Sequence, residues 1–139
     1  MVRFLLDTNI LSEPLRPQPN LTVMERLIDQ SEELATAAVV YHEMLFGLRR
    51  LPESKRRQAI AAYLQEEVET KLVILPYDAE AANWHAAERA RLVGTGRTPP
   101  FLDGQIAAIA VVNELILVTN NTSDYADFQQ LQLQNWFIP

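Results

Sequence analysis

The chain of 139 residues contains no cysteine, only four glycines and no apolar run long enough to cross a membrane. Without cysteine, disulfides, thiolate zinc sites and a cysteine nucleophile are all excluded. None of the glycines forms a P-loop or a dinucleotide-binding loop after a strand, which excludes the commonest nucleotide-binding α/β sites. The most apolar stretch, residues 106–118, is interrupted by Asn113 and Glu114 and is too short to span a bilayer. We therefore expect a soluble protein with no membrane partner.

The N-terminus also lacks the features of a secretory signal, because Asp7 ends the first apolar stretch early. Together with the missing cysteines, this favours a cytoplasmic location. A hydrophobic content of 48% and a charged content of 22% are typical of a globular chain. The length fits a single domain, residues 1–139, with a core that needs no disulfide or metal for support.

The net charge of −6 argues against a general nucleic-acid coat protein, since such domains are usually strongly basic. The basic residues are nevertheless gathered in two groups. The first group comprises Arg49, Arg50, Lys55, Arg56 and Arg57, and the second comprises Arg89, Arg91 and Arg97. Taken alone, each group is most simply interpreted as the solvated face of a helix.

Uninterrupted apolar segments alternate with amphipathic ones along the chain. The predicted strands are residues 2–6, 34–37, 72–76 and 115–119, with one short edge strand in the tail, residues 131–139. The predicted helices are residues 11–16, 21–30, 41–50, 52–68, 78–94 and 101–113. Strands without polar alternation are typical of a parallel sheet that is buried on both faces. The fold class is therefore α/β, with a central parallel β-sheet flanked by α-helices on both faces.

Four carboxylates follow these segments at the edge where such a sheet carries its functional groups. Asp7 follows the first strand, Glu43 lies in the helix after the second, and Asp103 opens a helix. Asp124 is expected in the loop after the strand at residues 115–119. Each aspartate, taken alone, is equally well explained as a helix cap or a turn residue, so the pattern carries more weight than any one member.

Glu43 is harder to explain as a cap, because it lies inside the apolar run AAVVYHEMLFG. An unpaired carboxylate facing the core would cost on the order of several kcal/mol. We therefore expect Glu43 to share a cation with Asp7 and Asp103. Neither His42 nor His85 is expected to bind metal, so the ligands are hard oxygens, which favours Mg²⁺ or Mn²⁺ over Zn²⁺.

Four stretches resemble, in order and spacing, the motifs of PIN-domain ribonucleases. They are LLDTNIL at the start, E-x-x-x-G from Glu43 to Gly47, FLDGQIAAIA around Asp103, and LVTNNTSDY around Asp124. The resemblance spans almost the whole chain, includes the closing segment, and is greatest to the VapC-type toxins of bacterial toxin–antitoxin pairs. Four motifs in the right order are far more specific than any one of them.

The resemblance implies a PIN-like domain that acts as a Mg²⁺- or Mn²⁺-dependent endoribonuclease. A metal-activated water would hydrolyse RNA phosphodiesters, with transfer RNA as a possible substrate. The catalytic and metal-binding set that it implies is Asp7, Glu43, Asp103 and Asp124, with Thr8 and Asn121 as supporting polar residues. In some relatives an acid stands at the position of Asn121, so the resemblance leaves open whether Asp124 binds metal directly or through water.

The resemblance also implies partners. An acidic pocket repels RNA, so we expect basic side chains at its rim to meet the phosphates. The RNA-binding candidates are Arg49, Arg50 and Arg97, with residues 55–57 beside them. The implied protein partners are a second copy in a homodimer and a VapB-type antitoxin whose basic tail can block the acid pocket. The residues Ile60, Tyr63 and Leu64 are a candidate dimer seam, although such residues more often belong to the core.

Two other functions compete with the nuclease. The first is a catalytically inactive PIN-like binding module, in which the acids cap helices and the protein acts through protein or RNA assembly. The complete set of four acids argues against it. The second is a Mg²⁺-dependent phosphatase with a phospho-aspartate intermediate, which is disfavoured because Asn9, not a second aspartate, stands two residues after Asp7.

Overall fold

The computed structural model describes residues 1–139 and contains one five-stranded sheet. The strands are β1 (Phe4–Leu6), β2 (Leu34–Ala37), β3 (Val73–Leu75), β4 (Ile116–Val118) and β5 (Gln132–Gln134). All four neighbouring pairs are parallel, in the order β3-β2-β1-β4-β5. The first strand of the chain therefore lies at the centre of the sheet, and the last strand forms one edge.

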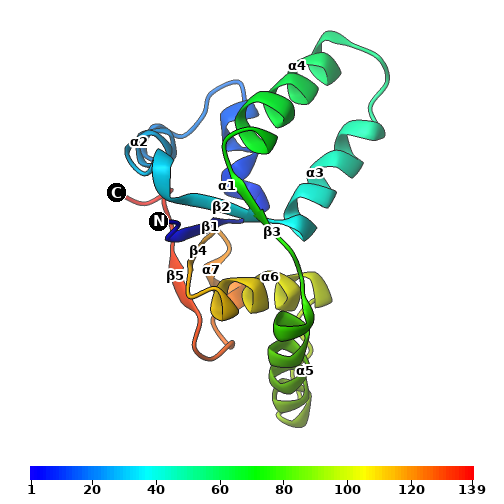
Figure 1. The fold of residues 1–139 in the computed structure, drawn as a ribbon, viewed down its shortest axis with the longest axis vertical. Helices are drawn as coiled ribbons and strands as arrows, with labels where there is room; N and C mark the ends of the chain where they lie inside the picture. Colours follow the sequence, from blue (N-terminus) through cyan, green and yellow to red (C-terminus); the bar gives the residue numbers. More distant parts are fainter.

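Helices cover both faces of this sheet (Figure 1). The α-helices are α1 (Thr8–Leu11), α2 (Leu21–Asp29), α3 (Ala38–Arg49), α4 (Lys55–Tyr63), α5 (Ala79–Gly94), α6 (Phe101–Val112) and α7 (Thr122–Tyr125). Shorter turns are the 3₁₀ helices η1 (Glu13–Leu15) and η2 (Ser31–Glu33) and the π-helical η3 (Leu64–Glu69). In Figure 1, α1 to α4 lie on one side of the sheet, and α5 and α6 lie on the other. This arrangement confirms the predicted fold class.

The core is built around β1 and α6. All three residues of β1 are buried, and α6 buries five consecutive residues, Ile106–Ala110. Three of these five are alanines, so the helix can approach the sheet closely. At the opposite end of the sequence, Trp136 packs edge-on against Phe4, with ring centroids 5.1 Å apart. No helix combines the length and the apolar character that crossing a bilayer requires.

Two element boundaries differ from the sequence prediction. The helix expected to start at Pro52 starts at Lys55, because the Ser54 side chain caps it by accepting a hydrogen bond from the backbone N–H of Arg57. Asp124 does not lie in a loop but in the short helix α7. The predicted bounds of β2 and the edge strand in the tail are confirmed. The helix predicted at residues 78–94 is also confirmed, and its first predicted residue, Asp78, caps it by accepting a hydrogen bond from the backbone N–H of Ala81.

Candidate active site

The parallel sheet brings the ends of its strands to one edge. Asp7 directly follows β1, and its backbone N–H extends the ladder by donating to the carbonyl of Val118 at 3.0 Å. Thr119 follows the neighbouring strand β4, so the two side chains leave adjacent strands at the same edge. In open α/β sheets this carboxyl edge is where functional groups gather.

Asp7 is buried, with 5% of its surface exposed, and every hydrogen bond at its carboxylate comes from a polar neighbour. The backbone N–H of Thr8 donates to Oδ1 at 2.8 Å, which makes Asp7 the N-cap of α1. Three side chains donate to Oδ2: Thr119 Oγ1 at 2.8 Å, Tyr125 OH at 3.2 Å and Asn9 Nδ2 at 3.4 Å. Asp7 can therefore cap α1 and serve in a functional site at the same time, because the cap uses Oδ1 and the side-chain donors use Oδ2.

A further layer of hydrogen bonds holds these donors in place. The backbone N–H of Asn120 donates to Asn9 Oδ1 at 2.9 Å, and that of Asn121 donates to Thr119 Oγ1 at 3.0 Å. The backbone N–H of Thr119 donates to the carbonyl of Gln134 in β5 at 3.0 Å. The predicted polar neighbour Asn121 therefore acts on Asp7 indirectly, through the Thr119 hydroxyl.

Asp103 lies half-buried in the first turn of α6. Burial, followed by the negative charges of Asp7 and Asp124, raises the pKa of its carboxyl from 3.8 to about 6, although hydrogen bonding to the Tyr125 hydroxyl acts in the opposite direction. Three aspartates from separate segments are therefore close enough to repel one another. An ionised cluster of this kind is stabilised by a cation.

Tyr125 lies between the acids and is 2% exposed. Burial raises the pKa of its hydroxyl far above the usual value, and the charges of Asp7 and Asp103 act in the same direction. The hydroxyl is therefore a neutral donor at physiological pH.

The structure places Glu43 differently from the prediction. Its side chain is exposed on α3, whereas Val40 and Met44 on the same helix are buried. The argument that Glu43 faces the core was therefore wrong. The apolar run belongs to one face of α3, and Glu43 stands on the other.

Glu43 instead lines a polar groove of about 900 Å³ together with Thr8, the residue after Asp7. Three arginines line the same groove: Arg16, Arg50 and Arg56. The groove thus connects Glu43 to the neighbourhood of Asp7, with basic side chains along it.

The two other arginine candidates are placed differently. Arg49 is exposed at the end of α3 and forms no ion pair with a carboxylate. Arg97 forms an ion pair with Asp127, which offsets much of its charge.

Neither histidine joins the acids. His42 is exposed, and His85 is a buried packing residue whose Nδ1 lies 2.9 Å from the hydroxyl of Tyr77. Burial lowers the pKa of His85, so the ring is neutral near pH 7. It packs directly against Gly104, where an added Cβ would lie 2.1 Å from Nε2.

The candidate dimer seam is not a continuous surface. Leu64 is 1% exposed and belongs to the core, while Ile60 lines the polar groove. Tyr63 lines a second, apolar groove of about 510 Å³, and its hydroxyl donates to the carbonyl of Leu11 at 2.5 Å. The three side chains therefore do not form one surface: Leu64 is in the core, and Ile60 and Tyr63 line two different grooves.

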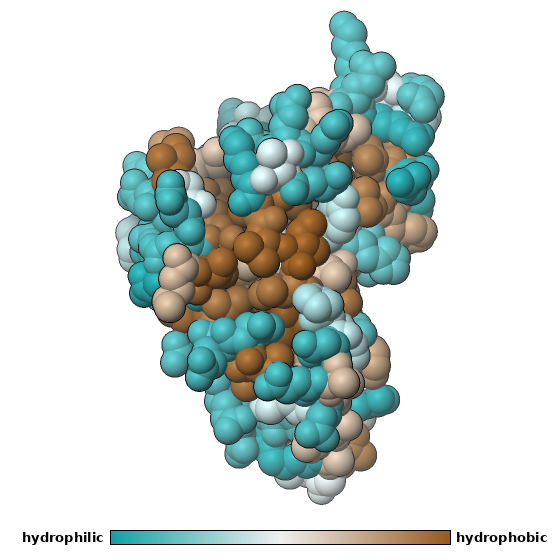
Figure 2. All heavy atoms as spheres, in the orientation of Figure 1, coloured by the Kyte–Doolittle hydropathy of each residue, from teal (hydrophilic) through white to brown (hydrophobic).

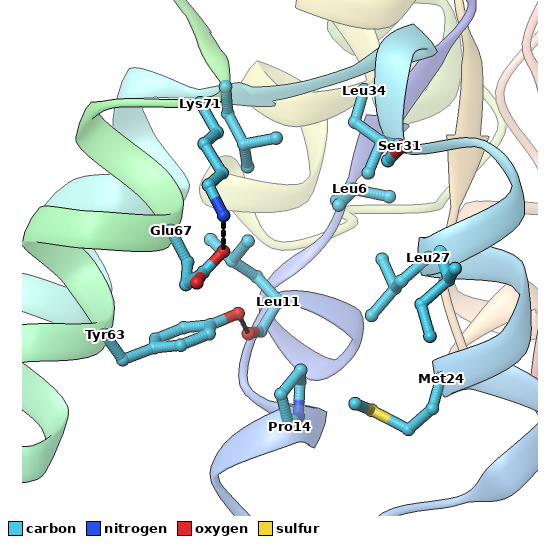
Figure 3. Close-up of a pocket in the computed structure, with 12 residues that line it drawn as sticks. Leu6, Leu11, Pro14, Met24, Leu27, Ser31, Leu34, Tyr63, Glu67 and Lys71 are labelled. Carbon is cyan, nitrogen blue, oxygen red and sulfur yellow. Dashed lines mark hydrogen bonds and ion pairs between the residues drawn. The ribbon is translucent and has the colours of Figure 1, made fainter.

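This second groove lies between α2 and the helical segment formed by α4 and η3 (Figure 3). Its apolar lining residues include Leu6, Leu11, Met24, Leu27 and Leu34. The exposed side chain of Ile28 also lines it. Figure 2 shows the hydrophobic area of this face as a hollow framed by hydrophilic residues.

Three residues that contact Asp7 were not among the predicted site residues: Asn9, Thr119 and Tyr125. The sequence does carry a signal for two of them, since polar residues that directly follow a buried strand tend to meet at the carboxyl edge. Thr119 directly follows β4, and Asn9 lies in α1, three positions after the end of β1. Tyr125 carries no comparable signal.

The available ligands for a metal ion at this edge are oxygen atoms only, which suits Mg²⁺ or Mn²⁺. The mutual repulsion of Asp7, Asp103 and Asp124 also fits a site for a cation. In the present side-chain arrangement, no three Asp, Glu or His side chains lie close enough to surround one ion.

The fold and the gathered aspartates define an α/β protein with an acidic, oxygen-only site at the carboxyl edge of a parallel sheet. Residues 4–130 match the family model of the PIN domain, and the chain belongs to that family.

Among the relatives, VapC ribonuclease Y4jK of Sinorhizobium fredii is 33% identical over 123 residues, covering 86% of this chain and 88% of that protein. The tRNA(fMet)-specific endonuclease VapC of Shigella flexneri is 30% identical over 136 residues, covering 98% and 99%. The crystal structure of FitAcB from Neisseria gonorrhoeae superimposes with a TM-score of 0.89 at 29% identity, covering 98% of this chain and 99% of that one.

Proposed function

We propose that this protein is a divalent-metal-dependent endoribonuclease and the toxin of a toxin–antitoxin pair. The observation that carries the proposal is the proximity of Asp7 and Asp124 to Asp103, whose pKa is raised to about 6 by burial and by the charges of these two aspartates. Relatives of similar length that are named as VapC ribonucleases support the same activity.

In this proposal Asp7, Glu43 and Asp103 form the acidic core that holds Mg²⁺ or Mn²⁺, with Asp124 as the fourth acid. Bound there, the ion lowers the pKa of a water and stabilises the charge on the departing oxygen of the phosphodiester. The donors Thr119 and Tyr125 orient the Asp7 carboxylate. Asp103, with a pKa of about 6, is mainly ionised at neutral pH and so is available to a cation.

The experiment is RNA cleavage by the purified protein with Mg²⁺ or Mn²⁺, with and without chelator. Asp7→Asn and Asp103→Asn are purified in the same way and serve as controls for contaminating nuclease. We expect cleavage by the unsubstituted protein only, and only with metal. Equal cleavage by all three proteins would overturn the acid site, and cleavage by none would favour the catalytically inactive binding module.

The toxin role is tested in bacteria. Induced expression should arrest growth, and Glu43→Gln should relieve the arrest. Because Glu43 is exposed, this substitution leaves the core intact and separates loss of function from loss of folding. Arrest by Glu43→Gln at equal expression would contradict the role of this acid. Sequencing the RNA ends left after brief induction would identify the substrate and the cleavage position.

The partners in this proposal are a second copy of the chain and a small antitoxin. Solved relatives include the FitAB complex bound to DNA, with a TM-score of 0.89 and 29% identity. The apolar groove of Figure 3 suits the apolar face of an antitoxin helix, since its lining side chain Ile28 is 71% exposed in the single chain.

This docking site is tested by co-purification with the cognate VapB-type antitoxin. Ile28→Glu should abolish co-purification, whereas Ile138→Glu, at an equally exposed position outside the groove, should leave it intact. Retention of the partner by Ile28→Glu would place the antitoxin elsewhere. Light scattering of the single chain tests the homodimer.

A further inference from the structure

The polar groove beside the acids is the strongest unexplained feature of the surface. It lies between the segment that follows β1 and the helices α3 and α4, and Arg16, Arg50 and Arg56 line it. Thr8 and Glu43 line the same groove. Because the backbone N–H of Thr8 is bonded to Asp7, the groove leads directly to the acid site.

Two of the three arginines that line this groove, Arg50 and Arg56, form no ion pair with a carboxylate. Arg50 is oriented by stacking its guanidinium on the ring of Phe46, 4.6 Å from the centroid. Arg16 is held by the carboxylate of Glu13, at 3.3 Å.

Most other arginines of the protein are neutralised. Arg3, Arg57, Arg91 and Arg97 each form an ion pair with a carboxylate. In a chain of net charge −6, a groove with two unpaired arginines near an acid site favours an anionic occupant.

We propose that this groove binds the RNA backbone on one side of the cleaved phosphodiester, with Arg50 and Arg56 contacting phosphates. The inference rests on the proposed nuclease function and names the path by which its substrate reaches the acids. RNA is favoured over an acidic protein segment because the nuclease reaction requires a polyanion to lie across both the groove and the acid site. In this proposal Arg97 contributes little to RNA binding, because its charge is already paired with Asp127.

The test compares Arg50→Gln, Arg56→Gln and the double variant with Arg3→Gln. Arg3 precedes β1 at the amino end of the sheet, so the control removes the same charge far from the groove. Binding of a labelled RNA hairpin is measured by fluorescence anisotropy across a salt series, in an Asp103→Asn background that prevents cleavage. Cleavage kinetics are measured in the active background.

Each groove variant should lower the slope of log affinity against log salt by about 0.7 to 0.9, and the double variant by about twice that. In the cleavage assay, the double variant should raise KM about tenfold, which corresponds to about 1.4 kcal/mol of lost binding free energy. Its kcat should change less than about twofold. The control should behave like the unsubstituted protein in both assays.

Three results would overturn the inference. If the groove variants have the same RNA affinity, salt dependence and KM as Arg3→Gln, the RNA does not bind in this groove. The proposed nuclease function would still stand in that case, provided that the unsubstituted protein cleaves RNA. If the parent neither binds nor cleaves RNA, the proposed function and this inference fail together. If a polyglutamate peptide binds the parent more tightly than the hairpin, and the double variant loses only that binding, the groove serves an acidic protein.

Discussion

The phenolic hydroxyl of Tyr125 donates a hydrogen bond to Oδ2 of Asp7, 118 positions earlier in the sequence. We expect Tyr125→Phe to lower stability by about 1–2 kcal/mol, because a buried carboxylate loses one of its donors. It should also lower kcat/KM for RNA cleavage about tenfold and raise the Mg²⁺ concentration that gives half-maximal cleavage, since Asp7 is less firmly oriented.

The matched control is Tyr63→Phe, which removes a hydroxyl bonded to a backbone carbonyl away from the acids. It should lower stability to a similar degree without changing the Mg²⁺ dependence. If both variants shift the metal dependence equally, the effect is one of folding and Tyr125 has no special role.

The raised pKa of Asp103 makes the metal-free protein less stable as pH rises. Its folded-state pKa of about 6 exceeds the ordinary value of 3.8, so between these values the folded state binds more protons than the unfolded state. This contribution to stability is therefore present below about pH 4 and is lost as pH rises through about 6. Because Asp103 is only half-buried, screening by solvent reduces the effect to about 1–2 kcal/mol.

Asp103→Asn should remove this penalty. In urea denaturation with chelator, we expect the variant to be more stable than the unsubstituted protein above about pH 6, and the difference to shrink toward about pH 4. A stability difference that stays constant with pH would show that Asp103 does not titrate in this range. The same variant should lose RNA cleavage, so stability and activity move in opposite directions.

Adding Mg²⁺ or Mn²⁺ should stabilise the protein through the same acids. At a metal concentration 100 times the dissociation constant, the expected gain is about 2.7 kcal/mol. The thermal unfolding temperature of Asp103→Asn should barely respond to metal, and Glu114→Gln, which changes an exposed acid after α6, should respond like the unsubstituted chain. Equal stabilisation of all three proteins would indicate nonspecific ion binding.

Gly104 tests the packing that positions Asp103. Gly104→Ala places a Cβ 2.1 Å from Nε2 of the buried His85, so α5 and α6 must move apart. We expect a loss of about 1–3 kcal/mol and reduced cleavage, because Asp103 precedes this position in α6. Gly47→Ala in α3 meets nothing within 4 Å and should raise stability by about 0.5–1 kcal/mol. Equal stabilities in chemical denaturation would contradict this difference.

Local sequence signals were sufficient for the fold. The apolar tetrapeptide Leu34–Ala37 predicted β2, and the capping residue Asp78 predicted the start of α5. Both features depend on residues within a few positions of each other. The start of α4 was misplaced because Pro52 and Ser54 both carry helix-start signals, and the hydrogen bond of Ser54 decides between them.

The site was predictable only in part. The position of Asp7 at the end of a buried strand located the correct sheet edge. Its contacts with Thr119 and Tyr125 bridge more than 110 positions, and no local pattern specifies them. Glu43 was misjudged because an apolar segment does not by itself reveal which face of its helix is covered. Direct metal binding by the four acids remains a prediction.

The edge strand β5 is synthesised after all the other strands, and this order affects when the site can assemble. Translation makes Asp7 first, but the strand whose Gln134 carbonyl holds Thr119 in place comes at the end of the sequence. The same segment supplies Trp136, which covers Phe4 at the centre of the sheet. A growing polypeptide in which residues 132–136 are not yet made therefore carries the acids without the support that orients them.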